Sequence, residues 1–387
     1  MLEEQTLPEY EQRKYHEVNI GDVYRDKYHI IAKLGYGAHS TVWLAKDKKS
    51  NNYISMKVCV LETESESPVA NEIRILQHVD KCAQAEKDQG SPGMLLTRRA
   101  SEIFSIPGRL GQHQCIVSKA ESASLHALQE AAASGPVLLP LIKPLLHRLL
   151  FPLSRLHHSC GVVHADLSPT NILTEAQDQS LFQQIESELA ANPITPASSN
   201  GTTIYPSLRT IRGMTSYPII TDFGKARFCA PNGSTEWCMP DLYRAPEILL
   251  GIPWDQSIDI WSLGMMALDF ITGEPLFDPI DRKDNTYVLP LALSQYIRIL
   301  GPPPLDLIQR GGRAAEYFDD KGNFLLASTL PTSPIPLKYL LPTDFPSEKE
   351  KELFLCFHRK IFLRDPSKRA TAEQLVDDEW LLSIFDE

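Results

Sequence analysis

Hydrophobic and polar positions follow two different periods along the chain. Residues 28–61 hold three runs rich in β-branched and aromatic residues, separated by glycine and asparagine, which predicts antiparallel strands joined in hairpins. Residues 69–79 change to helical spacing, with Val69, Ile73 and Leu76 on one face. From residue 136 onward periodic apolar segments predict helices, and the segment 257–273 is apolar on all sides, as expected of a buried helix.

Some local signals refine this pattern. The helical segment 140–160 contains Pro144 and Pro152, which are expected to kink or interrupt it. Thr371 is followed three residues later by Gln374, the spacing of a capping box at the start of a helix. A β-rich part followed by a helical part predicts an α+β fold with segregated parts.

The length of 387 residues exceeds the roughly 250–300 residues that one core supports, so we expect two lobes. We place an N-terminal extension at 1–23, a β-rich lobe at 24–118 and a helical lobe at 119–387. The stretch 174–217 is rich in Ser, Thr, Ala, Pro and Gln and is interpreted as an insertion within the helical lobe. It is expected to contain a helix and, around 198–203, a mobile loop.

Composition narrows the class of protein. Hydrophobic residues make up 43% and charged residues 22%, ordinary values for a soluble globular chain. The polar, acidic start has no apolar core like that of a secretory signal. The seven cysteines show no CxxC spacing, which favours a reducing compartment: the cytoplasm, with the nucleus as a second location. A net charge of −11 argues against direct nucleic-acid binding and suits a basic partner. We also expect the protein to be a monomer that does not bind membranes.

Two features of the β-rich part suggest phosphate binding. The segment 35–42 (GYGAHSTV) lies between two predicted strands, and its glycines would let the backbone approach phosphate oxygens, although a Gly-x-Gly turn is more often only a hairpin turn. Lys57 lies among apolar neighbours on the third predicted strand. Its amine either extends into water or holds phosphates beside an acidic partner, for which Glu72 is the candidate.

The segment 163–173 is more specific. A polar loop between two apolar stretches carries Asp166 and Asn171, five positions apart. An aspartate there can accept or orient a hydroxyl proton, and an asparagine oxygen suits Mg²⁺, although both residues also favour plain turns. A short β run ends in a second candidate metal ligand, Asp222, followed by Phe223 and Gly224.

Further along, the segment 243–247 (YRAPE) ends in Glu247, Asp259 opens the predicted buried helix and Arg369 lies near the end. Each motif alone has an ordinary structural explanation. Their order, from the glycine-rich loop through the strand lysine, the Asp/Asn loop and Asp-Phe-Gly to Ala-Pro-Glu, is that of the protein-kinase signature. Chance occurrence of all of them in this order is negligible.

The chain therefore resembles the eukaryotic protein kinases over residues 24–385, which implies a bilobal fold and use of ATP with Mg²⁺. The resemblance implies catalytic roles for Lys57 and Glu72, with Asp166 as the base, and Mg²⁺ ligation by Asn171 and Asp222. It also implies that Glu247 pairs with Arg369 and that Asp259 ties the buried helix to the catalytic loop. The implied nucleotide-binding residues are Gly35, Gly37, Ser40, Val42, Lys57, Ser118 and Ala120.

Within that family, the segments 15–22 (YHEVNIGD), 28–35 (YHIIAKLG) and 40–44 (STVWL) look like the SR-protein kinases, as does the insertion before Asp222. That branch phosphorylates serines in Arg-Ser-rich proteins. The resemblance thus implies a serine/threonine kinase with a basic, Arg-Ser-containing protein substrate. The acidic stretch 316–320 could contact such a substrate, although a solvated loop is the simpler interpretation.

Three departures from the family pattern bear on function. Ala165 replaces the arginine that usually pairs with a phosphate on the activation segment, so we predict constitutive activity. The SR-protein kinases also lack this arginine, so the change is consistent with that branch. Ser168 replaces a lysine that offsets charge on the transferred phosphoryl group, a loss of roughly 3–4 kcal/mol unless another residue compensates. Ser118 opens a hinge (SKAE) that is more polar than usual and would leave room behind the adenine.

These departures keep other functions open. A pseudokinase acting as a nucleotide-binding scaffold would account for Ser168, but the strand lysine, its glutamate partner and the three expected loop residues are all present. A kinase for small molecules fits less well, because the Ala-Pro-Glu segment is typical of peptide-binding activation segments.

Overall fold

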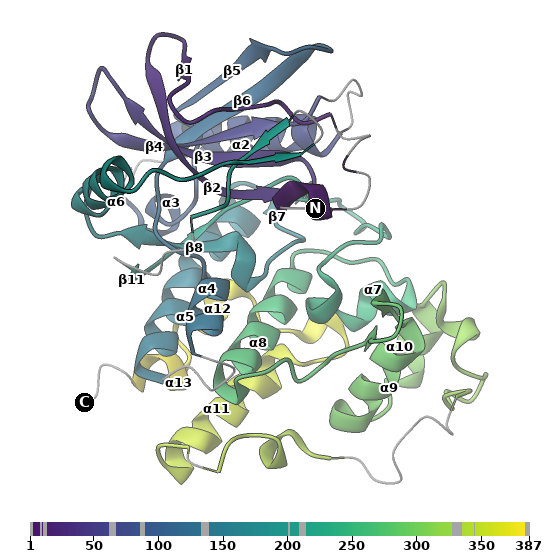
Figure 1. The fold of residues 1–387 in the computed structure, drawn as a ribbon. Coiled ribbons are helices and arrows are strands. Elements are labelled where there is room, and N and C mark those ends of the chain that lie inside the picture. Colours follow the sequence, from purple (N-terminus) through teal and green to yellow (C-terminus); the bar gives the residue numbers. More distant parts are fainter. Residues whose placement is uncertain are drawn as a thin grey trace. The chain divides into compact units, whose positions relative to one another are not determined.

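The computed structural model describes residues 3–7, 10, 14–61, 67–85, 90–132, 139–199, 202–208, 214–326, 335–343 and 345–383. The chain divides into two compact units. The first consists of Met1–Gln89, Thr97–Ala127 and Leu173–Gly224, and the second of Gly90–Leu96, Leu128–Ile172 and Lys225–Glu387. Strands dominate the first unit and helices the second, which confirms the predicted α+β class (Figure 1).

The first unit is built on a six-stranded sheet in the order β1-β2-β3-β4-β6-β5, with antiparallel neighbours throughout. The strands are β1 (Val23–Tyr24), β2 (Tyr28–Gly37), β3 (Ser40–Asp47), β4 (Tyr53–Cys59), β5 (Glu102–Pro107) and β6 (Gln112–Lys119). Helix α2 (Pro68–Ala85) follows β4, as predicted. Val69 and Leu76 are buried on it, whereas the third predicted core residue, Ile73, is only half-buried.

The predicted insertion packs against this sheet rather than with the helical part. Helix α6 (Ser180–Ala191) lies beside the sheet (Figure 1). It buries Phe182 and Ile185 in one cluster with Leu44 and Tyr53 of the sheet. Strand β8 (Ile172–Ala176) pairs with β11 (Met214–Ile220). The compact units therefore differ from the predicted boundaries, because the apolar face of α6 has its partners on β3 and β4.

The mobile loop predicted around residues 198–203 is also corrected. Strands β9 (Ala197–Ser199) and β10 (Thr202–Ile204) form an antiparallel pair there, with Thr202 opposite Ser199. Residues 200 and 201 lie outside the described part of the chain.

The N-terminal segment also contacts the sheet. A short 3-10 helix (Glu3–Thr6) brings Glu4 into an ion pair with Lys33 of β2, whose side chain is 0% exposed. Glu3 lies 3.7 Å from the same ammonium nitrogen. A cavity of about 420 Å³ lies between the N-terminal segment, β3 and β10. None of the predicted site residues lines this cavity.

The second unit is helical. Its helices are α3 (Pro92–Leu95), α5 (Leu139–Ser154), α7 (Pro246–Leu250), α8 (Ser257–Thr272), α9 (Leu289–Leu300), α10 (Leu305–Arg310), α11 (Glu348–Ile361), α12 (Ala372–Val376) and α13 (Glu379–Leu382), while α4 (Leu125–Ala131) bridges the division. Two short pairs accompany them, β7 (Val162–Val163) with β12 (Arg227–Phe228) and β13 (Ile280–Asp281) with β14 (Thr286–Tyr287).

The structure tests the local predictions for three of these helices. Helix α8 is buried from Ser257 to Ile271, and the capping box of Thr371 and Gln374 opens α12, both as predicted. Of the predicted kink or interruption of α5, the interruption is wrong, because the helix runs through Pro144 and Pro152. Six leucine and isoleucine side chains buried along one face offset the roughly 3 kcal/mol that an internal proline costs. Within the described ranges, no helix is long and apolar enough to cross a membrane.

Candidate active site

The strand register places the predicted nucleotide-binding side chains on one face of the sheet. Val42 pairs with Lys57 across β3 and β4, and Ser55 pairs with Ser118 across β4 and β6. Cross-strand partners share a face, and so do residues two apart in a strand. Val42, Lys57 and Ser118 are therefore on the same face, although they are far apart in the sequence.

Lys57 is held by a carboxylate, as predicted. Its Nζ lies 2.7 Å from Oε2 and 2.9 Å from Oε1 of Glu72 on α2. Burial acts to lower the pKa of Lys57, but the carboxylates of Asp222 and Glu72 outweigh it and raise the pKa. The amine is therefore a fixed positive charge, suited to contact phosphate oxygens.

Asp222 belongs to the same group. Its Oδ1 lies 3.4 Å from the Lys57 amine and accepts a hydrogen bond from the backbone N–H of Gly224 at 3.3 Å. The backbone of Asp222 is left-handed, with φ of 61°. Asn71, next to Glu72 on α2, donates from its amide to the carbonyl oxygen of Gly224 at 3.0 Å. One helix thus fixes both the lysine and the Asp-Phe-Gly turn.

The glycine-rich segment is a tight hairpin between β2 and β3. Gly35 pairs with Val42 and Gly37 with Ser40, which leaves residues 38 and 39 as the turn. The hydroxyl of Tyr15 donates to the carbonyl oxygen of Gly37 at 2.8 Å, so the N-terminal segment contacts the tip of this hairpin.

The predicted hinge spans the end of β6. Ser118 is buried on that strand and Ala120, just after its end, is 0% exposed. Lys119 points outward to an ion pair with Glu175 at 2.6 Å, with half of its side chain exposed. Burial raises the pKa of Glu121 to about 7. This hinge thus carries a titratable group that the sequence analysis did not single out.

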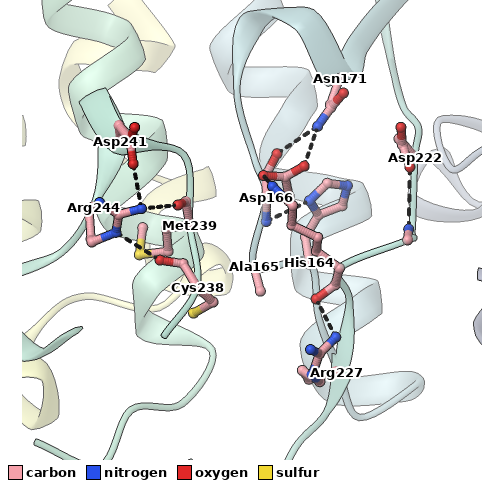
Figure 2. Close-up of polar contacts among 12 residues, drawn as sticks. His164, Ala165, Asp166, Asn171, Asp222, Arg227, Cys238, Met239, Asp241 and Arg244 are labelled. Carbon is pink, nitrogen blue, oxygen red and sulfur yellow. Dashed lines mark hydrogen bonds and ion pairs between the residues drawn. The ribbon is translucent and has the colours of Figure 1, made fainter. Parts of the chain in front are cut away.

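Asp166 and Asn171 lie together in the second unit. The Asn171 amide donates to the backbone carbonyl of Asp166 at 2.8 Å and to its carboxylate Oδ2 at 3.0 Å (Figure 2). The short 3-10 turn Pro169–Asn171 brings the two residues together. The amide oxygen of Asn171 is directed away from Asp166, because its nitrogen makes both bonds.

Asp259 anchors the loop that carries Asp166, as predicted. Its carboxylate accepts hydrogen bonds from the backbone N–H groups of His164 at 2.8 Å and Ala165 at 2.9 Å, and its Oδ2 lies 2.9 Å from Nε2 of His157. Burial alone would raise the pKa of Asp259, but the bonds from His157 and from the His164 backbone lower it. A charged carboxylate on the buried helix α8 therefore fixes the loop through its main chain.

Side-chain and backbone contacts hold the activation segment in place. The guanidinium of Arg244 donates to the carbonyl oxygens of Cys238 and Met239, at 3.0 and 2.8 Å, and to Asp241 at 2.7 Å (Figure 2). The backbone N–H of Met239 bonds to the carbonyl of Ala165 at 3.1 Å.

The ion pair that was predicted to support this segment is confirmed. Arg369 Nη1 lies 2.7 Å from Oε1 of Glu247, and both side chains are 0% exposed. The same guanidinium donates to the carbonyl oxygens of Ser257 and Leu363, at 2.7 and 3.0 Å. It thereby joins the Ala-Pro-Glu segment, helix α8 and the end of α11.

Three contacts around the site were not predicted from the sequence: Tyr15 with Gly37, Asn71 with Gly224, and Lys225 with Asp166 at 3.1 Å. Each joins residues distant in the chain. Of these, only the Lys225 contact could have been expected from the sequence, because a lysine directly after Gly224 places a charge next to the Asp-Phe-Gly motif.

Comparison with known proteins agrees with this geometry. A model of the protein kinase domain family matches residues 112–381. A serine/threonine protein kinase of Aspergillus fumigatus is 31% identical over 392 residues, which cover 99% of this chain and 91% of that protein. The serine/threonine-protein kinase SRPK of Physarum polycephalum is 28% identical over 411 residues (99% and 92%), and protein kinase dsk1 of Schizosaccharomyces pombe is 24% identical over 482 residues (99% and 86%).

The family match covers more than half of the chain, and the relatives extend the similarity over the N-terminal strands that carry the glycine-rich hairpin and Lys57. The chain belongs to the eukaryotic protein kinase family, where it resembles the SR-protein kinases, and it is an ATP-dependent serine/threonine protein kinase.

Proposed function

We propose that this kinase transfers the γ-phosphoryl group of ATP to serines of a basic protein that contains Arg-Ser dipeptides. The observation that carries the proposal is the Asp166–Asn171 pair, in which one carboxylate oxygen and the backbone of Asp166 are both bonded to the asparagine amide. This arrangement orients a carboxylate for a substrate hydroxyl, the chemistry that protein phosphorylation needs.

In the proposed reaction the serine hydroxyl gives its proton to Asp166 while its oxygen bonds to the γ-phosphorus. The bond from that phosphorus to the β,γ-bridging oxygen breaks, and ADP leaves with the electron pair. The Lys57 amine, kept charged by Glu72, holds phosphate oxygens of the nucleotide. Gly35, Gly37 and the side chains that share the Lys57 face would contact the rest of the nucleotide.

The residues present fit a magnesium ion. The Asp222 carboxylate and the amide oxygen of Asn171 are oxygen donors, which Mg²⁺ prefers, and 46% of the Asp222 side chain is exposed. We propose these two residues as its ligands. When bound, the ion offsets negative charge on the phosphate oxygens.

The choice of substrate rests on two observations. The chain carries a net charge of −11, which favours basic partners, and its similarity to kinases of the SR-protein type extends over the whole chain. The stretch 316–320 adds nothing to this, because Asp319 is engaged in its own turn, where it accepts hydrogen bonds from Asn323. The solvated-loop interpretation of that stretch is the better one.

The scaffold alternative gains no support from the geometry. Lys57 and Glu72 form a close ion pair, and Asp166 is bonded to Asn171, as an active kinase requires. A degraded kinase would be expected to have lost at least one of these contacts.

The test is phosphate incorporation from ATP and Mg²⁺ into an Arg-Ser repeat peptide, compared with a generic basic protein. Lys57→Met serves as the blank, and Asp166→Ala should abolish turnover while nucleotide binding persists. Transfer to the repeat peptide at a higher kcat/KM than to the generic protein is expected. Equal or better transfer to the generic protein would remove the Arg-Ser assignment, and full turnover by Asp166→Ala would remove the proposed base.

A further inference from the structure

The catalytic loop lacks a positive charge where the family pattern has one. Ser168, two positions after Asp166, is 7% exposed and has an extended backbone, with φ of −159°. A serine hydroxyl is neutral at any pH relevant to a protein. The charge that builds up during phosphoryl transfer therefore needs a cation from elsewhere.

Lys225 supplies a cation at this point. Its Nζ lies 3.1 Å from Oδ1 of Asp166, while Asn171 occupies Oδ2. Lys225 directly follows the Asp-Phe-Gly turn, so it comes from the activation segment and not from the catalytic loop. Both members of this ion pair belong to the second compact unit.

Backbone pairing brings Lys225 close to Asp166. Arg227 pairs with Val163 between β12 and β7, which places Lys225, two residues before Arg227, beside the loop that leads from Val163 to Asp166. The Arg227 guanidinium also donates to the carbonyl oxygen of Lys225 at 3.0 Å. The side chain itself is 59% exposed, so its amine can turn toward a bound substrate.

We propose that Lys225 is a catalytic residue that replaces the missing lysine at position 168 by contacting the phosphoryl group during its transfer. The inference rests on the proposed role of Asp166. A hydroxyl bound to that carboxylate lies about 2.7 Å from it, and the phosphorus bonds to the same hydroxyl oxygen. An ammonium with three N–H donors beside Asp166 can therefore bind the carboxylate and a phosphoryl oxygen together.

The atoms balance without a further reactant. The serine proton moves to Asp166, the serine oxygen bonds to phosphorus, and the bond to the bridging oxygen breaks to give ADP. Lys225 keeps its protons throughout and offsets negative charge on the phosphoryl oxygens as they move.

An inhibitory ion pair would behave in the opposite way. If Lys225 only occupied Asp166 in the resting enzyme, its removal would free the carboxylate and raise turnover. If the contact were an ordinary exposed ion pair, its removal would change little, since such pairs contribute at most about 1 kcal/mol to stability. The three alternatives thus predict a fall, a rise and no change in kcat.

The experiment compares Lys225→Ala with the wild type on both the Arg-Ser peptide and a generic basic protein, so that the outcome does not depend on substrate preference. We expect kcat to fall about 10²–10³-fold on both substrates, with KM for ATP changed much less. Lys360→Ala is the matched control, because Lys360 is 53% exposed and pairs with a buried carboxylate, Asp378, at 2.7 Å. Thermal unfolding of both variants shows that they fold.

Rescue distinguishes catalysis from structure. Adding a small alkylamine to Lys225→Ala should raise kcat at least tenfold above the value of that variant. Adding the substitution Ser168→Lys to the same variant, which places the cation in the catalytic loop, should do the same. Unchanged or increased kcat in Lys225→Ala, a change confined to KM, or the failure of both rescues would overturn the inference. Asp166→Asn in the same assay reports separately on the proposed base.

Discussion

The phenolic hydroxyl of Tyr15 donates a hydrogen bond to the carbonyl oxygen of Gly37, 2.8 Å away, at the tip of the glycine-rich hairpin. The neighbouring carbonyl of Ala38 lies 3.3 Å from the same hydroxyl. The ring of Tyr10 stacks on that of Tyr15, with 5.2 Å between centroids. The segment before the sheet therefore contacts the part of the fold that covers phosphates in this family.

Tyr15→Phe should weaken nucleotide binding. Loss of a hydrogen bond worth about 1 kcal/mol corresponds to a rise of about fivefold in KM for ATP, with kcat and KM for peptide little changed. Initial rates over a range of ATP concentrations give this value. Tyr339→Phe is the control, since 70% of Tyr339 is exposed. An unaltered KM for ATP in Tyr15→Phe would show that the contact does not restrain the hairpin.

The buried ion pair of Glu247 and Arg369 should be costly to break. Arg369→Ala leaves the Glu247 carboxylate charged and buried, which is expected to lower the free energy of unfolding by about 3–5 kcal/mol. Chemical denaturation measures it. Glu316→Ala removes an ion pair with Arg313 in which both side chains are at least 40% exposed. This change is expected to lower the free energy of unfolding by less than about 1 kcal/mol. Similar losses in the two variants would contradict the special role of the buried pair.

Activity should not need phosphorylation of the activation segment. Ser234 and Thr235 are the hydroxyl residues of 225–242, and Arg244 and Met239 already order the segment. The double variant Ser234→Ala/Thr235→Ala should keep its activity within about twofold of wild type, the scale of surface substitutions. Phosphatase-treated enzyme should behave in the same way. A large gain when the segment is phosphorylated would refute constitutive activity.

Asp269 on α8 should make stability depend on pH. Burial raises its pKa to about 7 in the folded protein, while the ordinary value is near 4. Between about pH 4 and 7 the folded state keeps a proton that the unfolded state has released, so stability should fall as pH rises through this window, by up to about 1.4 kcal/mol per unit. Asn in its place can still accept the hydrogen bond from Tyr243, at 2.9 Å in the wild type.

Unfolding by urea at pH 5, 6, 7 and 8 tests this. The decline should be smaller in the Asp269→Asn protein than in the wild type, with the remainder due to Glu121, whose pKa burial also raises to about 7. The exposed Asp320→Asn control should keep the full decline. Parallel curves for wild type and Asp269→Asn would mean that Asp269 does not hold its proton.

The active-site pairs could be predicted because sequence spacing constrains them strongly. The contacts of Lys57 with Glu72 and of Glu247 with Arg369 follow from motifs whose order is diagnostic, and the strands around Lys57 follow from their β-branched residues. The strands follow from local preference alone, whereas the Glu247–Arg369 pair joins residues 122 positions apart and was accessible only through the family resemblance.

Features that depend on tertiary packing could not be predicted in this way. Proline propensity indicated a break in α5, but the apolar face of the helix decided otherwise. The composition of 174–217 indicated a loop-rich insertion, yet Phe182 packs with Tyr53 against the sheet. Lys225 reaches Asp166 only through the pairing of β12 with β7, a contact between segments that are more than fifty residues apart.

Lys33 has a consequence for how the minimal folding unit of this kinase is defined. Its ammonium is fully buried in strand β2, and its counter-charge comes from Glu4, near the start of the chain. A recombinant fragment that began at β1 would keep every signature motif and yet lose the carboxylate that pairs with the Lys33 ammonium, together with the segment that contacts it. The boundary of autonomous folding therefore lies upstream of the boundary that catalytic motifs would suggest.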